Sequence, residues 1–218
     1  SLNESSVLSP YIPPGWSYFA GQDGQPYAEF EMAVGASGPD AGEQGSVVTV
    51  SEYVTGWQAN ETIAFFAAHP DEPVFAFVPL RAPHDPHTPA PQDVGSQSGF
   101  RYRGGAFNEA DVRDKPAWIQ ALPLISDDDI TILDRTNQER LETLASVDRA
   151  VVHIVDALER SGRAENTVLV LTSDNGQQWG EHRLVDKGVP YQESVHVPLI
   201  LWNPAFEGKR LDTLVAAN

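Results

Sequence analysis

The chain has 218 residues, of which 41% are hydrophobic and 9% aromatic, so it can form one globular domain with a sizeable core. Its 14 Lys and Arg against 31 Asp and Glu give a formal net charge of −17, which argues against nucleic acid or an anionic membrane as a partner, because both bind cationic surfaces. The absence of cysteine from these residues excludes disulfides, thiolate metal sites and cysteine nucleophiles within them.

The first part of the chain predicts an irregular segment, a hairpin and a helix. Residues 1–26 are rich in Ser, Pro and Gly, which is typical of irregular structure. Tyr27–Val34 and Ser46–Tyr53 have the composition of strands, and the glycine-rich loop Gly35–Gly45 between them indicates a hairpin. Thr55–Ala68 has its apolar residues spaced as in a helix.

A second strand and polar loop are predicted next. Pro73–Val78 is a short apolar run bounded by prolines, which favours a buried strand, and it leads into the loop Leu80–Pro89. Prolines stiffen this loop and lower the entropy cost of holding His84 or His87 in place. A histidine in such a loop is also commonly just solvated, so His84 has two interpretations at this point, and His87 belongs to the rim or to a substrate pocket.

A long loop and a long helix follow. Residues 91–125 have no sustained periodicity, and a loop of that length commonly forms a lid or a substrate wall. Ser126 is a good N-cap followed by three acidic residues, and the helix that it starts is expected to end at Gly162. Its apolar residues fall at three- and four-residue steps, which indicates one stripe that covers a sheet. We expect Asp148, Arg149 and His153 to be solvated or capping groups.

The richest stretch of the chain lies between two predicted buried strands, Val168–Leu171 and Val197–Trp202. The first strand leads directly to Asp174 and Asn175, whose side chains offer the hard oxygen ligands that calcium or magnesium prefers. Ligands of open α/β sheets bind at the carboxyl ends of strands, which favours a site here. Asp-Asn-Gly is also ordinary turn chemistry, so a plain turn is the alternative. The order of strands and helices predicts an α/β fold with a mostly parallel sheet flanked by helices.

Several motifs together resemble one family. They are the Pro-Pro-Gly-Trp segment ending at Trp16, the Ala-Pro-His-x-Pro loop around His84, Thr172-Ser-Asp-Asn-Gly176, Gly180-Glu-His-Arg-Leu184, Asp186-Lys-Gly188 and Tyr191–Leu199. This set resembles the sulfatase family of the alkaline phosphatase superfamily, and most closely its N-acetylglucosamine-6-sulfatases and bacterial arylsulfatases. The resemblance implies an alkaline phosphatase-like α/β fold in which residues 1–218 form the later part of a single catalytic domain, truncated at both ends.

The resemblance also implies roles for individual residues. Asp174 and Asn175 match the family's second pair of calcium ligands, a site at which Mg²⁺ is also possible. Lys187 matches the lysine that contacts sulfate and helps stabilise the leaving group. His84 matches the sulfate-contacting histidine and is a candidate acid for the leaving oxygen, while His182 is a weaker candidate for the substrate pocket. The alternatives are that Lys187 is a surface lysine and that a salt-bridged rim is formed by Glu181, Arg183 and Glu193.

One departure from the family concerns the nucleophile. Sulfatases carry it in an early Cys/Ser-x-Pro-x-Arg segment as formylglycine, and neither that segment nor the early Asp-Asp pair occurs in residues 1–218. We therefore expect both to lie in a missing N-terminal segment and expect the chain alone to be inactive. A fragment that lacks core strands is also expected to leave sheet edges and apolar faces uncovered.

The expected function is that of a calcium-dependent sulfuric ester hydrolase that acts on sulfated carbohydrates or aryl sulfates. The alternatives are a phosphodiesterase or phosphonate monoester hydrolase of the same superfamily, and a non-catalytic remnant that binds sulfated glycans. The expected partner is a sulfated small molecule or glycan, with neither nucleic acid nor a membrane. The expected compartment is extracytoplasmic, either periplasmic or secreted, because sulfatases are often exported.

Overall fold

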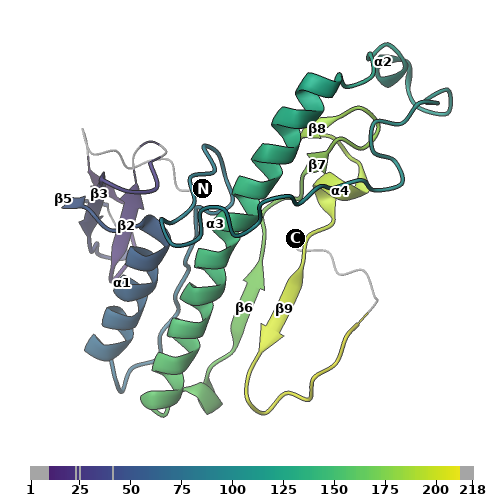
Figure 1. Ribbon diagram of the computed structural model, residues 1–218. Helices are drawn as coiled ribbons and strands as arrows, with labels where there is room; N and C mark the ends of the chain where they lie inside the picture. The colour runs from purple at the N-terminus through teal and green to yellow at the C-terminus, as the bar shows by residue number, and fades with distance from the viewer. Residues whose placement is uncertain (1–9, 23, 25, 41, 212–218) are drawn as a thin grey trace.

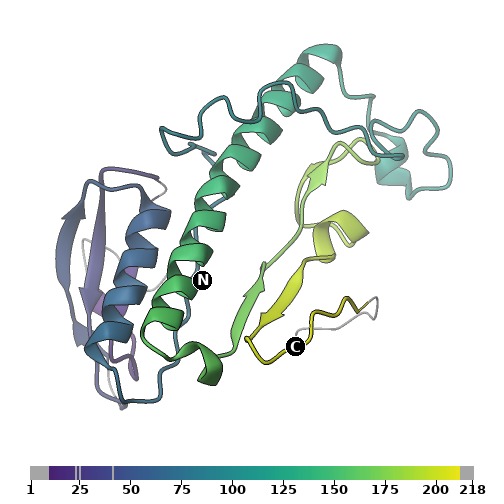
Figure 2. The ribbon, with the colours of Figure 1, turned by 60° about the horizontal axis from the view of Figure 1, so that its bottom comes forward.

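A computed structural model describes residues 10–22, 24, 26–40 and 42–211 of the chain. Its elements lie in successive layers: a small sheet, the helix α1, the long helix α3 and a two-stranded sheet follow one another across the molecule (Figures 1 and 2). In chain order the elements are β1 (Tyr11–Ile12), β2 (Phe19–Gln22), β3 (Phe30–Gly35), β4 (Glu43–Gln44), β5 (Ser46–Val50), α1 (Val54–Ala68), α2 (Ala117–Gln120), α3 (Asp127–Arg160), the 3-10 helix η1 (Ala164–Asn166), β6 (Leu169–Thr172), β7 (Gln178–Trp179), β8 (Val185–Asp186), α4 (Gln192–Val195) and β9 (Leu199–Trp202).

The predicted hairpin is confirmed. β3 pairs with β5 in antiparallel register, with Phe30 opposite Val50 and Val34 opposite Ser46. The expectation of irregular structure before it is wrong in part, because β2 adds a third strand to the sheet and β1 pairs with β4. These short strands form because Ile12 and Phe19 are buried, so the segment gains apolar burial by pairing.

The main hydrophobic core lies between the three-stranded sheet, α1 and α3. The predicted helix α1 is confirmed, and it buries Val54 and Trp57 against this sheet. The Trp57 ring meets the Phe30 ring edge to face with 6.2 Å between centroids, a favourable aromatic geometry. Val147 of α3 packs against the same cluster, so α3 is fixed to the N-terminal half of the chain.

The helix α3 begins and ends where the sequence predicts. The Ser126 hydroxyl accepts a hydrogen bond from the Asp129 amide at 3.2 Å, and Gly162 adopts a left-handed φ of 71° just after the helix. The predicted apolar stripe is only part of the buried face. A row of polar residues at three-residue steps is also buried, namely Asp134, Asn137, Arg140, Thr143 and Ser146. The apolar stripe predicted from the sequence does not include these residues.

The segment after the His84 loop runs along α3 and is held there by charged pairs (Figure 1). The buried Asp93 carboxylate binds the Arg149 guanidinium, with 2.8 Å between Oδ1 and Nη1. The expectation that Arg149 is solvated or capping is therefore wrong. The buried Asp134 carboxylate accepts from both Arg101, at 2.7 Å, and Arg103, at 2.8 Å. Polar contacts to α3 thus hold in place a segment that has no secondary structure of its own.

We expect Asp134→Asn to destabilise the fold in a pH-dependent way. Hydrogen bonding from Arg103, with Arg101 beside it, lowers the pKa of the Asp134 carboxyl. A carboxyl with a lowered pKa in the folded state stabilises above its unfolded pKa of about 3.9, and this contribution is lost as pH falls through the folded pKa. Urea unfolding at pH 7 should therefore show a loss of roughly 1.5–3 kcal/mol in the variant, shrinking towards pH 3.

The matched control for this experiment is Asp148→Asn, which alters an exposed carboxylate on the same helix and should change the unfolding free energy by less than about 0.5 kcal/mol. A deficit in Asp134→Asn that is equal at pH 7 and pH 3 would show that the charge of Asp134 does not stabilise the fold.

The two strands around the richest stretch of sequence form, but not in the predicted sheet. β6 and β9 pair with each other in antiparallel register, from Leu169 opposite Trp202 to Thr172 opposite Leu199. Every strand pairing among the described residues is antiparallel, in contrast to the parallel sheet that we expected. The side chains of this sheet are also more exposed than predicted, since Val170 is 55% and Ile200 is 51% exposed. Apolar sequence produces burial only where other elements cover both faces.

The predicted strand Pro73–Val78 is wrong. The structure assigns it no strand pairing, and its two phenylalanines are largely exposed, Phe75 by 80% and Phe77 by 60%. A strand requires a partner for its backbone N–H and C=O groups, and no described strand lies in register beside this segment. Composition alone indicated its strand propensity but not the missing partner.

Candidate functional site

One cavity collects side chains from three distant parts of the chain. It has a volume of about 820 Å³ and lies beside the N-terminal half of α3, next to the segments that carry His84 and Lys187. One part of its wall is apolar and comes largely from the end of the long loop, whose role as a lid or substrate wall stays a prediction. The polar and charged residues of the wall are His84, Asp85, His87, Asp129, Thr136, Arg140, Gln177, Arg183, Asp186 and Lys187.

The His84 loop is fixed by backbone contacts and presents two imidazoles to this cavity. The Tyr27 hydroxyl donates a hydrogen bond to the His84 carbonyl at 2.5 Å. The half-exposed His84 ring places Nδ1 2.6 Å from the Asp85 carboxylate. His87 lies deeper, with Nδ1 2.9 Å from the Pro83 carbonyl oxygen, and burial lowers its pKa. Both histidines that the sequence left open therefore line the cavity.

Lys187 reaches the same cavity from the other side, directly after β8. Its Nζ lies 3.5 Å from Oδ1 of Asn175, a side chain that follows β6. The Asn175 amide in turn donates to the Gly176 carbonyl at 2.8 Å, which fixes its orientation. The structure thus brings together Lys187, Asn175 and, through the cavity, His84. Asp174 lies next to them, exposed at the end of β6.

Gly176 is the position at which this strand end closes onto α4. Its amide donates to the Ser194 carbonyl at 2.8 Å. A Cβ at this position would lie 2.1 Å from the carbonyl oxygen of Glu193, closer than any real contact allows. Only glycine therefore permits the close approach of the two backbones that holds Asp174 and Asn175 in place.

The side chains at the end of β6 offer the type of ligand that a hard cation prefers, but too few of them to hold the ion alone. Asp174 and Asn175 offer carboxylate and amide oxygens, whereas Ca²⁺ takes about six to eight oxygen ligands. Within residues 10–211, masked positions aside, no group of three or more acidic, histidine or cysteine side chains is placed to hold a metal ion. The two side chains fit as part of a larger ligand set.

His182 has structural partners outside the cavity. Its Nδ1 lies 2.7 Å from the Glu109 carboxylate, its ring centroid is 4.7 Å from that of Tyr191, and its side chain is only 14% exposed. It is not part of the cavity wall described above. The structure therefore separates His182 from His84 and Lys187, and its assignment to the substrate pocket stays a prediction.

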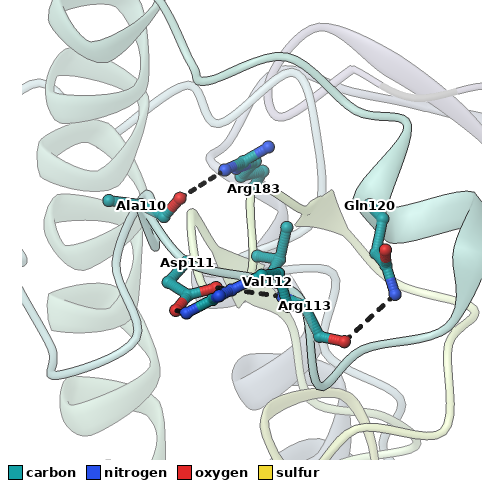
Figure 3. Close-up of a pocket in the computed structure, with 6 residues that line it drawn as sticks. All are labelled: Ala110, Asp111, Val112, Arg113, Gln120 and Arg183. Carbon is teal, nitrogen blue, oxygen red and sulfur yellow. Dashed lines mark hydrogen bonds and ion pairs between the residues drawn. The ribbon is translucent and has the colours of Figure 1, made fainter.

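Arg183 and Glu181 do not form the salt-bridged rim that was the alternative interpretation. The Arg183 guanidinium donates to the backbone carbonyls of Glu109, Ala110 and Leu122 at 2.6–2.9 Å. It also lines a second, smaller hollow of about 400 Å³ beside the Asp111–Arg113 pair (Figure 3). Glu181 is buried and accepts a hydrogen bond from the Trp179 amide at 2.6 Å. It also hydrogen-bonds Tyr102, which raises the pKa of that phenol to about 12.

Arg140 is the cavity residue that sequence reasoning missed. It lies in the buried polar row of α3 and is only 9% exposed. The three-residue spacing of these polar side chains is visible in the sequence, but the apolar stripe alone was used to predict the buried face.

Comparison with known proteins identifies the family. Residues 16–217 match the sequence profile described as Sulfatase. The chain belongs to the sulfatase family. This sulfatase chain is 32% identical to N-acetylglucosamine-6-sulfatase of Capra hircus over 212 residues, and 35% identical to an arylsulfatase of Volvox carteri over 139 residues. These matches cover 95% and 63% of the chain. Other matched sulfatases are named extracellular sulfatase homologs.

The fold of the sulfatase chain is confirmed by a solved structure. That protein was solved in complex with its substrate, D-glucosamine-2-N,6-O-disulfate. It matches with a TM-score of 0.64 and 18% identity, over 88% of this chain and 52% of that one. The predicted alkaline phosphatase-like α/β fold is thus shown. The sulfatase chain spans 37% of the length of the goat N-acetylglucosamine-6-sulfatase and 21% of the Volvox arylsulfatase.

Proposed function

We propose that the complete protein containing this chain is a sulfuric ester hydrolase that acts on sulfated carbohydrates or aryl sulfates. The observation that carries the proposal is the convergence of His84 and Lys187 on one cavity, in a chain whose residues 16–217 match the sulfatase family. The named substrates of its relatives support a sulfated ligand. We further propose that residues 1–218 are part of one larger catalytic domain, which agrees with their share of the length of these relatives.

The proposed roles follow the chemistry of a sulfate ester. The attacked sulfur is shielded by negatively charged oxygens, so a catalyst must offset that charge and protonate the leaving alkoxide. Lys187 supplies a cation for a sulfate oxygen and for the developing alkoxide. His84 is the proton donor to the leaving oxygen, and its contact with Asp85 at 2.6 Å supports a positioned ring.

A metal and a formylglycine complete the proposed site. Asp174 and Asn175 would hold Ca²⁺ or Mg²⁺ together with oxygen ligands from outside residues 1–218, and the bound ion would offset the charge of the sulfate oxygens. The nucleophile, proposed to be formylglycine, also lies outside these residues, because they contain no cysteine and no Ser-x-Pro-x-Arg. His182 is proposed as a more distant contact of the substrate.

The proposed compartment is extracytoplasmic, and support comes from the relatives that are named extracellular sulfatase homologs. None of the helices in the described part of the chain is both long and apolar enough to cross a membrane. The net charge of −17 supports a small sulfated ligand bound by local cations rather than a polyanionic nucleic acid.

The test is an assay of the complete protein with 4-nitrophenyl sulfate, glucosamine 6-sulfate and bis-4-nitrophenyl phosphate. We expect sulfate release from at least one sulfate ester, lost on treatment with EDTA and restored by Ca²⁺. The Asp174→Ala variant should require a much higher Ca²⁺ concentration for activity, because a charged ligand is lost. Preferential cleavage of the phosphodiester would favour the phosphodiesterase alternative, and binding of glucosamine 6-sulfate without any turnover would favour the non-catalytic one.

A further inference from the structure

Arg140 is a buried cation on the wall of the same cavity. It lies near the middle of α3, is 9% exposed, and lines the cavity together with His84 and Lys187. One guanidinium nitrogen, Nη1, donates to Oδ1 of Asn137 at 3.2 Å. The Nε–H is buried and has no hydrogen-bond partner. An arginine offers five N–H donors, so most of the hydrogen-bonding capacity of this group remains unused by the contacts that the structure gives it.

Arg140 differs in its partners from two arginines packed along α3, Arg103 of the preceding segment and Arg149 of α3 itself. Arg103 and Arg149 each bind a buried carboxylate at 2.9 Å or less, on Asp134 and Asp93 respectively. For Arg140, no carboxylate of the described residues lies within ion-pair distance. A buried charge without a counter-ion is strongly unfavourable, so a counter-ion from outside these contacts is expected.

Arg140 lines the same cavity as both proposed sulfate contacts, and two carboxylates act on its guanidinium there. Burial lowers the pKa of Arg140, and Asp186 and Asp85 partly offset this effect. These two carboxylates are the chain neighbours of Lys187 and His84. They line the cavity but are not bound to the guanidinium, since Asp85 contacts His84 instead. The guanidinium therefore lies on the wall of the cavity that His84 and Lys187 also line.

We propose that Arg140 is a third binding residue for the tetrahedral oxyanion that occupies this cavity, next to His84 and Lys187. The inference rests on the proposed function, because it takes the sulfuryl group as the occupant. The planar guanidinium can bind two oxygens of such a group in parallel, which the point charge of Lys187 cannot do. Asn137 accepts from Nη1 at 3.2 Å and so restricts the orientation of the guanidinium on the cavity wall.

The experiment measures binding of inorganic sulfate to the complete protein by calorimetry, for the wild type, Arg140→Met and Arg140→Lys. Methionine keeps an unbranched apolar side chain but removes the charge. We expect Arg140→Met to weaken sulfate binding roughly 10- to 100-fold, as for loss of hydrogen bonds to a charged group. Arg140→Lys should lie in between, because it keeps the charge without the planar fork. The matched control is Arg135→Met, an exposed arginine of the same helix whose side chain is 80% exposed, which should bind sulfate like the wild type.

Unfolding by urea without sulfate separates a binding role from a structural one. Replacement of a buried, unpaired charge by an apolar side chain is neutral or stabilising, so ligand-free Arg140→Met should be at least as stable as the wild type. A lower unfolding midpoint of this variant would identify Arg140 as a structural partner of Asn137 and overturn the proposal. Unchanged sulfate affinity in Arg140→Met would overturn it as well.

A parallel assay of sulfate ester hydrolysis distinguishes failure of the proposed hydrolase function from failure of the proposed role of Arg140. If the wild type hydrolyses the ester and Arg140→Met binds sulfate normally, the inference fails and the proposed function stands. If the wild type binds sulfate through Arg140 but hydrolyses no ester, the proposed function fails and the inference stands. If the wild type neither binds sulfate nor hydrolyses the ester, both fail.

Discussion

Lys187→Met in the complete protein is expected to lower kcat/KM for a sulfate ester by roughly 100- to 1000-fold, the usual cost of removing one stabilising contact from the charge that develops in the transition state. Lys187 is exposed on the cavity, and its hydrogen-bond contact is the 3.5 Å approach to Asn175. The thermal unfolding temperature should therefore stay close to that of the wild type. Steady-state kinetics combined with a thermal scan checks both expectations.

The substitution Lys209→Met is the matched control, because it removes a lysine charge from an exposed position outside the cavity wall. Its kcat/KM should equal that of the wild type. If Lys187→Met keeps full activity, Lys187 is the surface lysine of the alternative interpretation. A leaving-group series sharpens the result: loss of Lys187 should affect esters with poor leaving groups more than those with good ones, because the lysine is proposed to stabilise the departing alkoxide.

Gly176→Val is expected to destabilise the protein by about 1–3 kcal/mol or more, the range for side chains forced into well-packed sites. The added Cβ would lie 2.1 Å from the Glu193 carbonyl oxygen and 3.0 Å from its carbon, so the backbone of α4 or of the strand end must move. Either move shifts the backbone next to Asn175, whose Oδ1 lies 3.5 Å from Nζ of Lys187. We therefore expect activity to fall further than the population of folded protein accounts for, which urea unfolding and an ester assay on the same samples can measure.

The control for this prediction is Gly208→Ala, at a glycine whose added Cβ would have no heavy atom within 4 Å. Its stability should change by less than about 0.5 kcal/mol. Normal stability in Gly176→Val would contradict the close approach of the strand end to α4. Normal activity in a destabilised Gly176→Val would show that the positions of Asp174 and Asn175 do not depend on that approach.

The elements whose ends and periodicity are set by neighbouring residues were predictable from the sequence. Ser126 and the acidic residues after it start α3, and Gly162 follows its end, because capping and the left-handed φ of 71° are set by residues within one turn. The β3–β5 hairpin and α1 follow for the same reason, since their periodicity and turns are encoded by neighbouring residues. The positions of His84, Asp174, Asn175 and Lys187 came from motifs that resemble the sulfatase family.

What surrounds each element was decided only by the tertiary structure. Pro73–Val78 has strand composition but no strand partner, and β6 pairs with β9 in antiparallel rather than parallel register. The convergence of His84, Lys187 and Arg140 on one cavity depends on contacts between segments far apart in the chain. Periodicity indicates which face of a helix or strand is apolar. The pairing of a strand, the burial of its side chains and the lack of a counter-ion for Arg140 depend instead on which other segments pack against that face. For this reason Arg140, which lies outside the predicted apolar stripe, became visible as a cavity residue only in the folded chain.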